Sequence, residues 1–259
     1  MKCNNENIKT EVMNDDSTIL PVVTSENQLA KIEHEQLDIL TNAAKSSPRS
    51  LEKVISEVVS IATIDKETAE SCYYVLKRKG KDGKDVYIVG PSVRLAEIFL
   101  HSWRNTRLQI YITEIGERIR AVANIIDLER GTAVSREVIR RGTNKFGQLM
   151  SDDMLVMTAN AAMAIAKRNA IFDLIPRAIV NQTLEKIKGS LRKKGQSIEK
   201  AREEAIKYFE SIGVPSEKVL QWLEVEKVED IKEEQLENLR GLATALKDGE
   251  TTIKEEFGI

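Results

Sequence analysis

The chain has 259 residues, of which 41% are hydrophobic and 31% are charged, and its formal net charge is −2. This length suffices for one large hydrophobic core or two smaller ones. With only two cysteines, Cys3 and Cys72, and no Cys/His cluster of zinc spacing, we expect neither a disulfide framework nor a metal site, and a reducing setting. No apolar run approaches about 18 residues and the N-terminus is polar and acidic, so we expect no membrane span and no signal peptide.

The small net charge hides a segregation of charge along the chain. Residues 73–147 contain 15 Lys and Arg against 8 Asp and Glu, and residues 148–200 contain 9 against 5. The flanks are acidic, with 7 against 13 in residues 1–72 and 8 against 15 in residues 201–259. A basic region on a folded core is the electrostatic signature of a protein that holds a polyanion, which points to nucleic acid without proving it.

The first elements are predicted to be helices. Residues 1–26 lack apolar periodicity and indicate a flexible arm. Helical spacing of apolar residues begins near Gln28 and is broken at Ser46-Ser47-Pro48, after which Ser50 can cap a second helix.

A β pattern follows from Tyr73 onward. YYVLKRKG and KDVYIVG are typical of two strands joined by a turn at Asp82-Gly83, because this dipeptide suits turn positions with positive φ. Gly90-Pro91-Ser92 then opens a helix to about Trp103. Three further strands are predicted at 107–114, 118–127 and 132–141, and their short connections require antiparallel pairing.

The second half of the chain is predicted to be helical. A long helix from Ser151 to about Asp173 is apolar nearly all round, so we expect it to be buried under the sheet. A basic helix follows from Pro176, and acidic helices follow at 197–211, 216–224 and 229–247. The predicted fold class is α+β, an antiparallel meander with a preceding hairpin packed on a long helix, plus a small all-α C-terminal domain. The expected domains are an arm at 1–26, a DNA-binding and oligomerisation core at 27–195, and an acidic partner-binding domain at 196–259.

Arginines on the predicted strands are the first candidate ligands for a polyanion. Alternation places Arg118 and Arg120 on one face of their strand, and Arg136 and Arg140 on one face of theirs. Guanidinium groups at strand spacing could grip successive phosphates, although cross-strand pairing with nearby carboxylates is an equally open alternative. The basic candidates of this region also include Arg141 and Lys145.

Further candidates lie on the predicted helices. Asn160, Lys167 and Arg168 share one stripe of the long helix, where the cations could contact DNA or complement the helix dipole. Arg104, at the end of a predicted helix, is a further cationic candidate for DNA binding. The ring of the neighbouring Trp103 could stack on a base or belong to the core.

Few residue patterns in this sequence match those of enzyme active sites. GKDGKD lacks the spacing of a phosphate-binding loop and precedes a strand, and two histidines, His34 and His101, offer no triad. Asp127 and Glu129, with Glu137, could hold a metal in a nuclease, although a turn between strands explains the first two more simply. We expect no cofactor and no catalytic residue.

Three blocks resemble phage single-strand annealing proteins, the superfamily of RecT, Redβ and Erf. They are GPSVRLAEIFLHSW at 90–103, AMAIAKRNAIFDLIP at 162–176, and the tail at 212–257 with its KDGETT ending. By matching position, the resemblance points to Lys167 and Arg168, and to Arg94 in the first block.

The resemblance implies a function without ATP hydrolysis. It implies binding of single-stranded DNA, annealing of complementary strands through a duplex intermediate, ring or helical homo-oligomers, and a location in the cytoplasm of a bacterial host. The acidic C-terminal helices would contact a phage exonuclease or the host single-strand-binding protein. A non-enzymatic adaptor and a metal-dependent nuclease remain as alternatives.

Overall fold

The structure is a computed structural model that describes residues 26–80, 82–193 and 198–259. The arm predicted for residues 1–26 therefore lies outside the described residues, except for Glu26. The chain divides into two units, up to Ile39 and from Leu40 onward. The first helix, α1, spans the boundary between the units, and the elements discussed below belong to the second unit.

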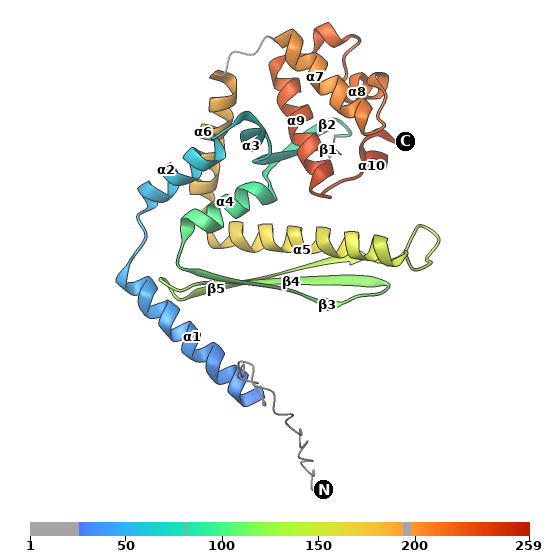
Figure 1. The fold of residues 1–259 in the computed structure, drawn as a ribbon. Coiled ribbons are helices and arrows are strands. Elements are labelled where there is room, and N and C mark those ends of the chain that lie inside the picture. The colour runs from blue at the N-terminus through green and yellow to red at the C-terminus, as the bar shows by residue number, and fades with distance from the viewer. Residues whose placement is uncertain (1–25, 81, 194–197) are drawn as a thin grey trace, which may run out of the picture. The chain divides into compact units, whose positions relative to one another are not determined.

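The described elements follow the predicted order, with two additional short helices and a 3₁₀ turn (Figure 1). Helices α3 and α10, each of 5 residues, were not predicted; Asp65 and Thr252 cap them by accepting hydrogen bonds from backbone N–H groups. The bounds are α1 Glu26–Ser46, α2 Leu51–Ala62, α3 Lys66–Glu70, β1 Tyr73–Lys79, β2 Asp85–Pro91, α4 Val93–Trp103, β3 Thr106–Glu114, β4 Arg118–Asp127, β5 Thr132–Arg141, α5 Asp152–Leu174, α6 Arg177–Lys193, α7 Ile198–Ser211, α8 Ser216–Leu223, a 3₁₀ turn Val228–Asp230, α9 Glu233–Lys247 and α10 Ile253–Phe257.

The three-stranded sheet is antiparallel, with β4 between β3 and β5, and α5 lies along one of its faces (Figure 1). Side chains at alternate positions of β4 face the helix and are at most 1% exposed: Ile119, Ala121, Ala123 and Ile125. The facing side of α5 is also rich in alanine, and Ala162, Ala166 and Ala170 are fully buried. Small side chains on both surfaces allow the helix to lie close to the sheet. The predicted meander on a long helix is confirmed.

Helix α5 is not buried all round, contrary to what its apolar composition predicts. Met154, Val156 and Met157, in its first two turns, are 47%, 55% and 65% exposed. The sheet covers one face of the helix, and α4 contacts it as well. The apolar composition therefore predicts the covered face of α5 correctly. It does not reveal that the first two turns of the helix stay exposed among the described residues.

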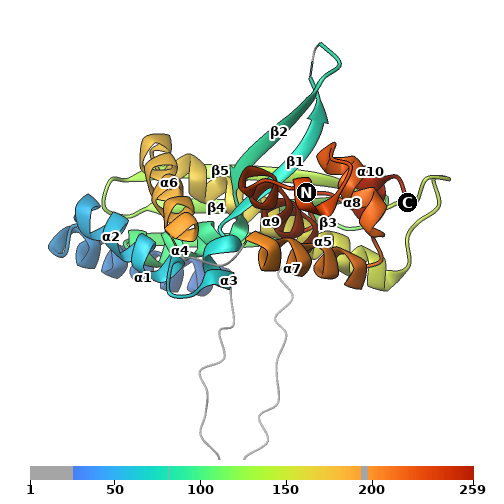
Figure 2. The same cartoon turned by 90° about the horizontal axis from the view of Figure 1, so that it is seen from above.

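The hairpin β1–β2 forms a second sheet that packs against α9. Its turn contains Gly83 at φ +77°, as the Asp82-Gly83 dipeptide predicts. A Cβ on Gly241 of α9 would lie 2.3 Å from a methyl carbon of Val75, so the glycine permits the close contact. Figure 2 shows both strands leaving the helical layer toward their turn.

The C-terminal helices share the core of the second unit. Phe209, Trp222 and Phe257 stack edge-on or tilted with ring centroids 5.8 and 6.5 Å apart, and all three belong to the same buried cluster as the residues of the sheet. Leu40–Ile259 therefore form one compact unit. The division into a DNA-binding core and a partner-binding domain concerns function and stays a prediction. Among the described residues, no helix combines the length and the apolar character that crossing a membrane requires.

Candidate nucleic-acid interface

The two faces of the β3–β4–β5 sheet separate the strand arginines. Arg118 and Arg120 flank Ile119, which is buried against α5, so both arginines lie on the open face. Arg141 is the cross-strand partner of Arg118 and shares that face. The alternation predicted for β4 is confirmed.

The other two arginines of β5 lie on the opposite face of the sheet. Arg136 pairs in register with Ala123, and Arg140 with Ile119, and both partners are fully buried beneath α5. Arg136 forms an ion pair with Asp173 at the end of α5, and this hydrogen bond raises the pKa of the guanidinium. The predicted arginines thus do not form one continuous row.

Arg120 is neutralised on the open face by two carboxylates. Its guanidinium forms ion pairs with Glu137 on β5 and, at 3.3 Å, with Glu114 on β3. These hydrogen bonds, the one from Glu137 first, raise the pKa of Arg120. Of the two alternatives for the strand arginines, phosphate binding or cross-strand pairing with carboxylates, Arg120 adopts cross-strand pairing.

Arg118 and Arg141 stand opposite each other without such neutralisation. They are register partners at the end where β4 begins and β5 ends, and both are exposed. Neither forms an ion pair within the described part of the chain. Like charges directly opposite each other in an antiparallel pair destabilise it, and a bound anion would remove the repulsion.

The loop after β5 adds a cation and an aromatic ring to this end of the sheet. The side-chain oxygen of Asn144 accepts hydrogen bonds from the N–H groups of Phe146 at 2.9 Å and Gln148 at 3.1 Å, which tightens the loop. Phe146 is 74% exposed, and the ammonium of Lys145 lies 4.9 Å from the centroid of its ring. An exposed ring beside cations is the arrangement on which unpaired bases stack.

Close backbone contact holds the loop against the start of β4. The N–H of Gly142 donates to the carbonyl of Glu117 at 2.8 Å, and a Cβ at Gly142 would lie 1.8 Å from the carbonyl oxygen of Gly116. Arg118 and Arg141 adjoin these contacts in the chain. We call Arg118, Arg141, Lys145 and Phe146 the strand-end cluster.

Helix α4 and helix α5 hold a second group of predicted residues. Lys167 on α5 and Arg94 on α4 both contact Glu97, at 2.5 and 3.1 Å. Burial alone would raise the pKa of Glu97, but the hydrogen bonds from the two cations outweigh it and lower the pKa. Asn160 is exposed on α5, seven residues before Lys167.

Arg168 is buried, contrary to a role as an open DNA ligand. Its side chain is 10% exposed and forms an ion pair with Glu250, and its guanidinium carbon lies 4.9 Å from the centroid of the Tyr74 ring. Arg140 donates to the carbonyl of Gly249 at 2.7 Å. The acidic C-terminal region therefore covers two of the predicted DNA-binding cations.

Trp103 belongs to the core. Of its two alternatives, the core position describes the ring and base stacking does not. The ring is 2% exposed and its N–H donates to Asp127 at 3.4 Å. Arg49, which the sequence does not single out, lies over this ring at 4.6 Å and donates to Asp127 at 2.5 and 2.7 Å. The neighbouring Arg104 is exposed and contacts Glu57 at 3.2 Å.

Arginine side chains engage all three carboxylates of the nuclease alternative, and Arg49 binds Asp127 and Glu129. Glu129 lies 3.2 Å from its guanidinium, and Glu137 binds Arg120 instead. Burial would raise the pKa of Asp127, but hydrogen bonds from Arg49 outweigh it and lower the pKa. Over the described ranges, no group of three or more His, Cys, Asp or Glu side chains could hold a metal ion.

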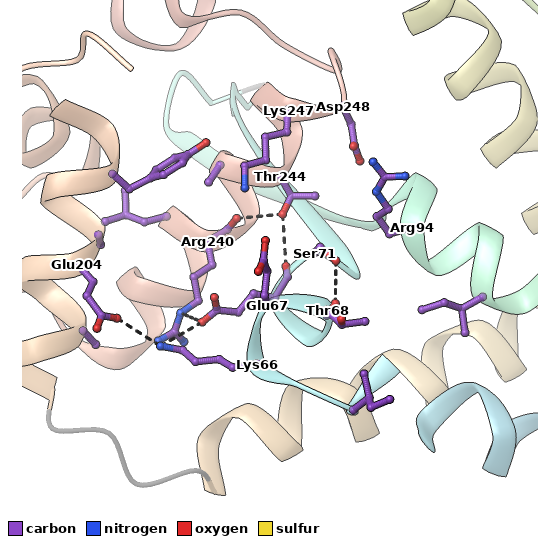
Figure 3. Close-up of a pocket in the computed structure, with 18 of the residues that line it drawn as sticks. Lys66, Glu67, Thr68, Ser71, Arg94, Glu204, Arg240, Thr244, Lys247 and Asp248 are labelled. Carbon is purple, nitrogen blue, oxygen red and sulfur yellow. Dashed lines mark hydrogen bonds and ion pairs between the residues drawn. The ribbon is translucent and has the colours of Figure 1, made fainter. Parts of the chain in front are cut away.

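A cavity of about 720 Å³ lies between helices α3 and α4 and helices α7 and α9 (Figure 3). Ion pairs cross its wall, with Arg240 at 2.8 Å from Glu70 and Lys66 at 3.5 Å from Glu204. Its apolar lining includes Ile98, Tyr208 and Leu239. Nothing in the sequence marks these residues, because they come from separate elements and share no motif.

Comparison of the chain with protein-family models, with curated proteins and with solved structures finds no match in any of the three.

Proposed function

We propose that this protein binds single-stranded DNA and anneals complementary strands without ATP. The strand-end cluster carries the proposal, because Arg118 and Arg141 face each other as unpaired cations and the loop that follows Arg141 carries an exposed aromatic ring. Phosphates neutralise the facing guanidinium groups, and a base stacks on Phe146. The resemblance of the three sequence blocks to phage annealing proteins supports the same function.

Cations that already form ion pairs are less available to DNA phosphates than the cations of the strand-end cluster. Arg120, Arg136, Lys167 and Arg168 each have a carboxylate partner, so binding through any of them must replace an existing ion pair. Arg118, Arg141 and Lys145 need no such replacement. The single strand therefore enters at the strand end of the sheet, and its bases remain available for pairing with a second strand.

Oligomerisation is part of the proposal. The exposed apolar side chains Met154, Val156 and Met157 on α5 lie on the helix that follows the strand-end cluster. Apolar surface of this kind marks protein contacts. Copies arranged as a ring or helical filament would hold one strand along successive clusters, while the acidic helices 198–257 contact an exonuclease or a single-strand-binding protein of the host.

Removal of the two facing arginines tests the proposal. The Arg118→Gln/Arg141→Gln variant should bind a fluorescent oligo-dT about 25-fold more weakly near 0.1 M salt, and its log–log salt slope should be smaller by about 1.4, since each lost phosphate contact on a single strand contributes about 0.7. The matched control is Arg130→Gln/Arg177→Gln, which removes two exposed arginines without side-chain partners among the described residues. Equal affinities of the two variants would refute the site.

The base-stacking role of Phe146 has its own readout. Phe146→Ala should weaken oligonucleotide binding by about 1–3 kcal/mol and leave the salt slope unchanged, because a ring contributes stacking and no charge. The same variant should also anneal two complementary labelled oligonucleotides more slowly in the absence of ATP, as measured by energy transfer between the labels. An unchanged annealing rate would show that bases do not stack there.

A protein-interaction adaptor is the second candidate, and the cavity between α3, α4, α7 and α9 favours it. The cavity combines apolar side chains with charged groups at its wall, which is the lining that ligand and peptide pockets have. The adaptor function predicts that the full chain binds oligo-dT no better than background at low salt. Salt-dependent binding by the wild type decides for the annealing function.

A further inference from the structure

The connection between α9 and α10 lies against the basic surface of α5 and β5. Glu250 forms an ion pair with Arg168 on α5, and the carbonyl of Gly249 accepts a 2.7 Å hydrogen bond from Arg140 on β5. Gly249 has φ +69°, and a Cβ there would lie 3.1 Å from the Cβ of Ala161 on α5. The backbone turns at this glycine and brings residues 248–250, which we call the carboxylate segment, onto the helix.

The carboxylate segment occupies the guanidinium groups of Arg168 and Arg140. The side chains of Arg168 and Glu250 are only 10% and 9% exposed, so their contact excludes solvent. A guanidinium group binds carboxylate and phosphate oxygens through the same planar arrangement of N–H donors. Glu250 therefore supplies to Arg168 the kind of oxygen that a phosphate would supply.

The carboxylates of this segment are incompletely satisfied in the docked position. The Oδ2 atom of Asp248 is buried without a hydrogen-bond partner. Burial raises the pKa of Asp248 and of Glu250, and it outweighs the opposing effect of the surrounding cations, which are Arg94 on α4, Arg168 on α5 and Arg140 on β5. Docking the ionised segment thus carries a desolvation cost that is relieved when it returns to water.

We propose that the carboxylate segment covers a second binding site for the phosphates of single-stranded DNA, formed by Arg140 and Arg168, and that bound DNA displaces it. This inference rests on the proposed function, because it names how the same DNA-binding activity is held back. The strand-end cluster binds the strand first, and the covered site opens when phosphates replace Glu250 at Arg168. The segment lies between Lys247, which ends α9, and Ile253, which begins α10, so within the helices its movement breaks only backbone hydrogen bonds at the last turn of α9.

Neutralising Glu250 should strengthen DNA binding. Glu250→Gln removes the competing charge and exposes up to two further phosphate contacts, each contributing about 0.7 to the salt slope. Oligo-dT should therefore bind about 5-fold to 25-fold more tightly near 0.1 M salt, with a slope steeper by about 0.7 to 1.4. The control is Glu226→Gln, which removes one negative charge from an exposed C-terminal side chain that makes no contact within the described residues.

A measurement on the wild-type protein covers the case in which Glu250→Gln fails to fold. The N–H of Asp248 donates to the carbonyl of Thr244, and the N–H of Glu250 donates to the carbonyl of Ala245, both at 2.9 Å. Adding saturating oligo-dT should make the amide of Glu250 exchange its hydrogen faster, because displacement breaks its bond to α9.

The outcomes separate the two proposals. If the wild type binds oligo-dT, but Glu250→Gln equals Glu226→Gln and exchange at residues 248–250 is unaffected by DNA, the covered site is refuted and the DNA-binding function stands. If the wild type does not bind oligo-dT at low salt, the proposed function fails and this inference fails with it. Tighter binding by Glu250→Gln together with faster exchange supports the covered site.

Discussion

Replacing Asp127 with alanine tests whether the carboxylate at the end of β4 is structural. Asp127 accepts two hydrogen bonds from Arg49, one from the Trp103 ring, and one from each of the backbone N–H groups of Glu129 and Arg130 at 3.1 Å. The side chains of Arg49 and Asp127 are 2% and 3% exposed. Asp127→Ala therefore leaves a buried guanidinium with Glu129 as its remaining carboxylate partner within the described residues.

The expected loss follows from the burial of this pair. Removing one partner of a buried ion pair costs about 3–5 kcal/mol, because the other charge stays out of water without compensation. For a unit the size of Leu40–Ile259, each kcal/mol shifts the melting temperature by about 2–4 °C. The melting temperature of Asp127→Ala should thus fall by roughly 6–20 °C.

The acid dependence of stability should change as well. Hydrogen bonds from Arg49 outweigh the effect of burial and lower the pKa of Asp127, so its folded pKa lies below its unfolded pKa of about 3.9. The stability that ionised Asp127 contributes to the folded state is present above the unfolded pKa and is lost as the pH falls through the folded pKa. Urea unfolding at several pH values below 5 should show a shallower loss of stability for Asp127→Ala than for the wild type.

The assay needs a control and a DNA readout. Asp230→Ala changes an exposed aspartate without a side-chain partner among the described residues, and it should stay within about 0.5 kcal/mol of the wild type. The affinity for oligo-dT should be unchanged in Asp127→Ala at temperatures where it is folded. A melting temperature equal to that of Asp230→Ala would refute the reasoning, and loss of a magnesium-dependent cleavage seen in the wild type would favour the nuclease.

The other two predictions concern packing and thiol chemistry. Gly241→Ala should destabilise the protein by about 1–3 kcal/mol in urea unfolding, because the new methyl collides with Val75. Gly189→Ala, also in a helix but with no atom within 4 Å of the new methyl, should stabilise it by about 0.4–1 kcal/mol, and the opposite order would contradict the packing. Burial raises the pKa of Cys72 to about 12, so iodoacetamide at pH 8 should leave the peptide containing Cys72 unmodified until the protein is unfolded; rapid modification in the native state would contradict its burial.

Strand positions were predictable because their signal is local. The predicted strands 107–114, 118–127 and 132–141 agree with β3, β4 and β5 to within one residue. Alternating apolar residues and glycine-containing turns define such strands within about ten residues of chain. The short helices α3 and α10 were missed, because five residues are too few to show a helical period.

The candidate site was predictable only in part. Arg118 and Arg141 come together as exposed cations and Lys145 is exposed in the loop that follows, whereas Trp103 and Arg168 are buried. Arg49 was missed although it organises the turn between β4 and β5, because it acts on a residue 78 positions away. The sequence shows that a residue is charged but does not show which distant group it meets.

The amino-acid sequence alone determined the order of most elements, which side chains of one strand share a face, and the acidic–basic–acidic distribution of charge. Each of these depends on neighbours in the chain, through backbone periodicity or composition. Only the tertiary structure decided that Arg168 meets Glu250, 82 residues later, while Arg118 and Arg141 meet each other. Such pairing depends on how separate segments pack, and packing is set by the whole core and not by any local pattern.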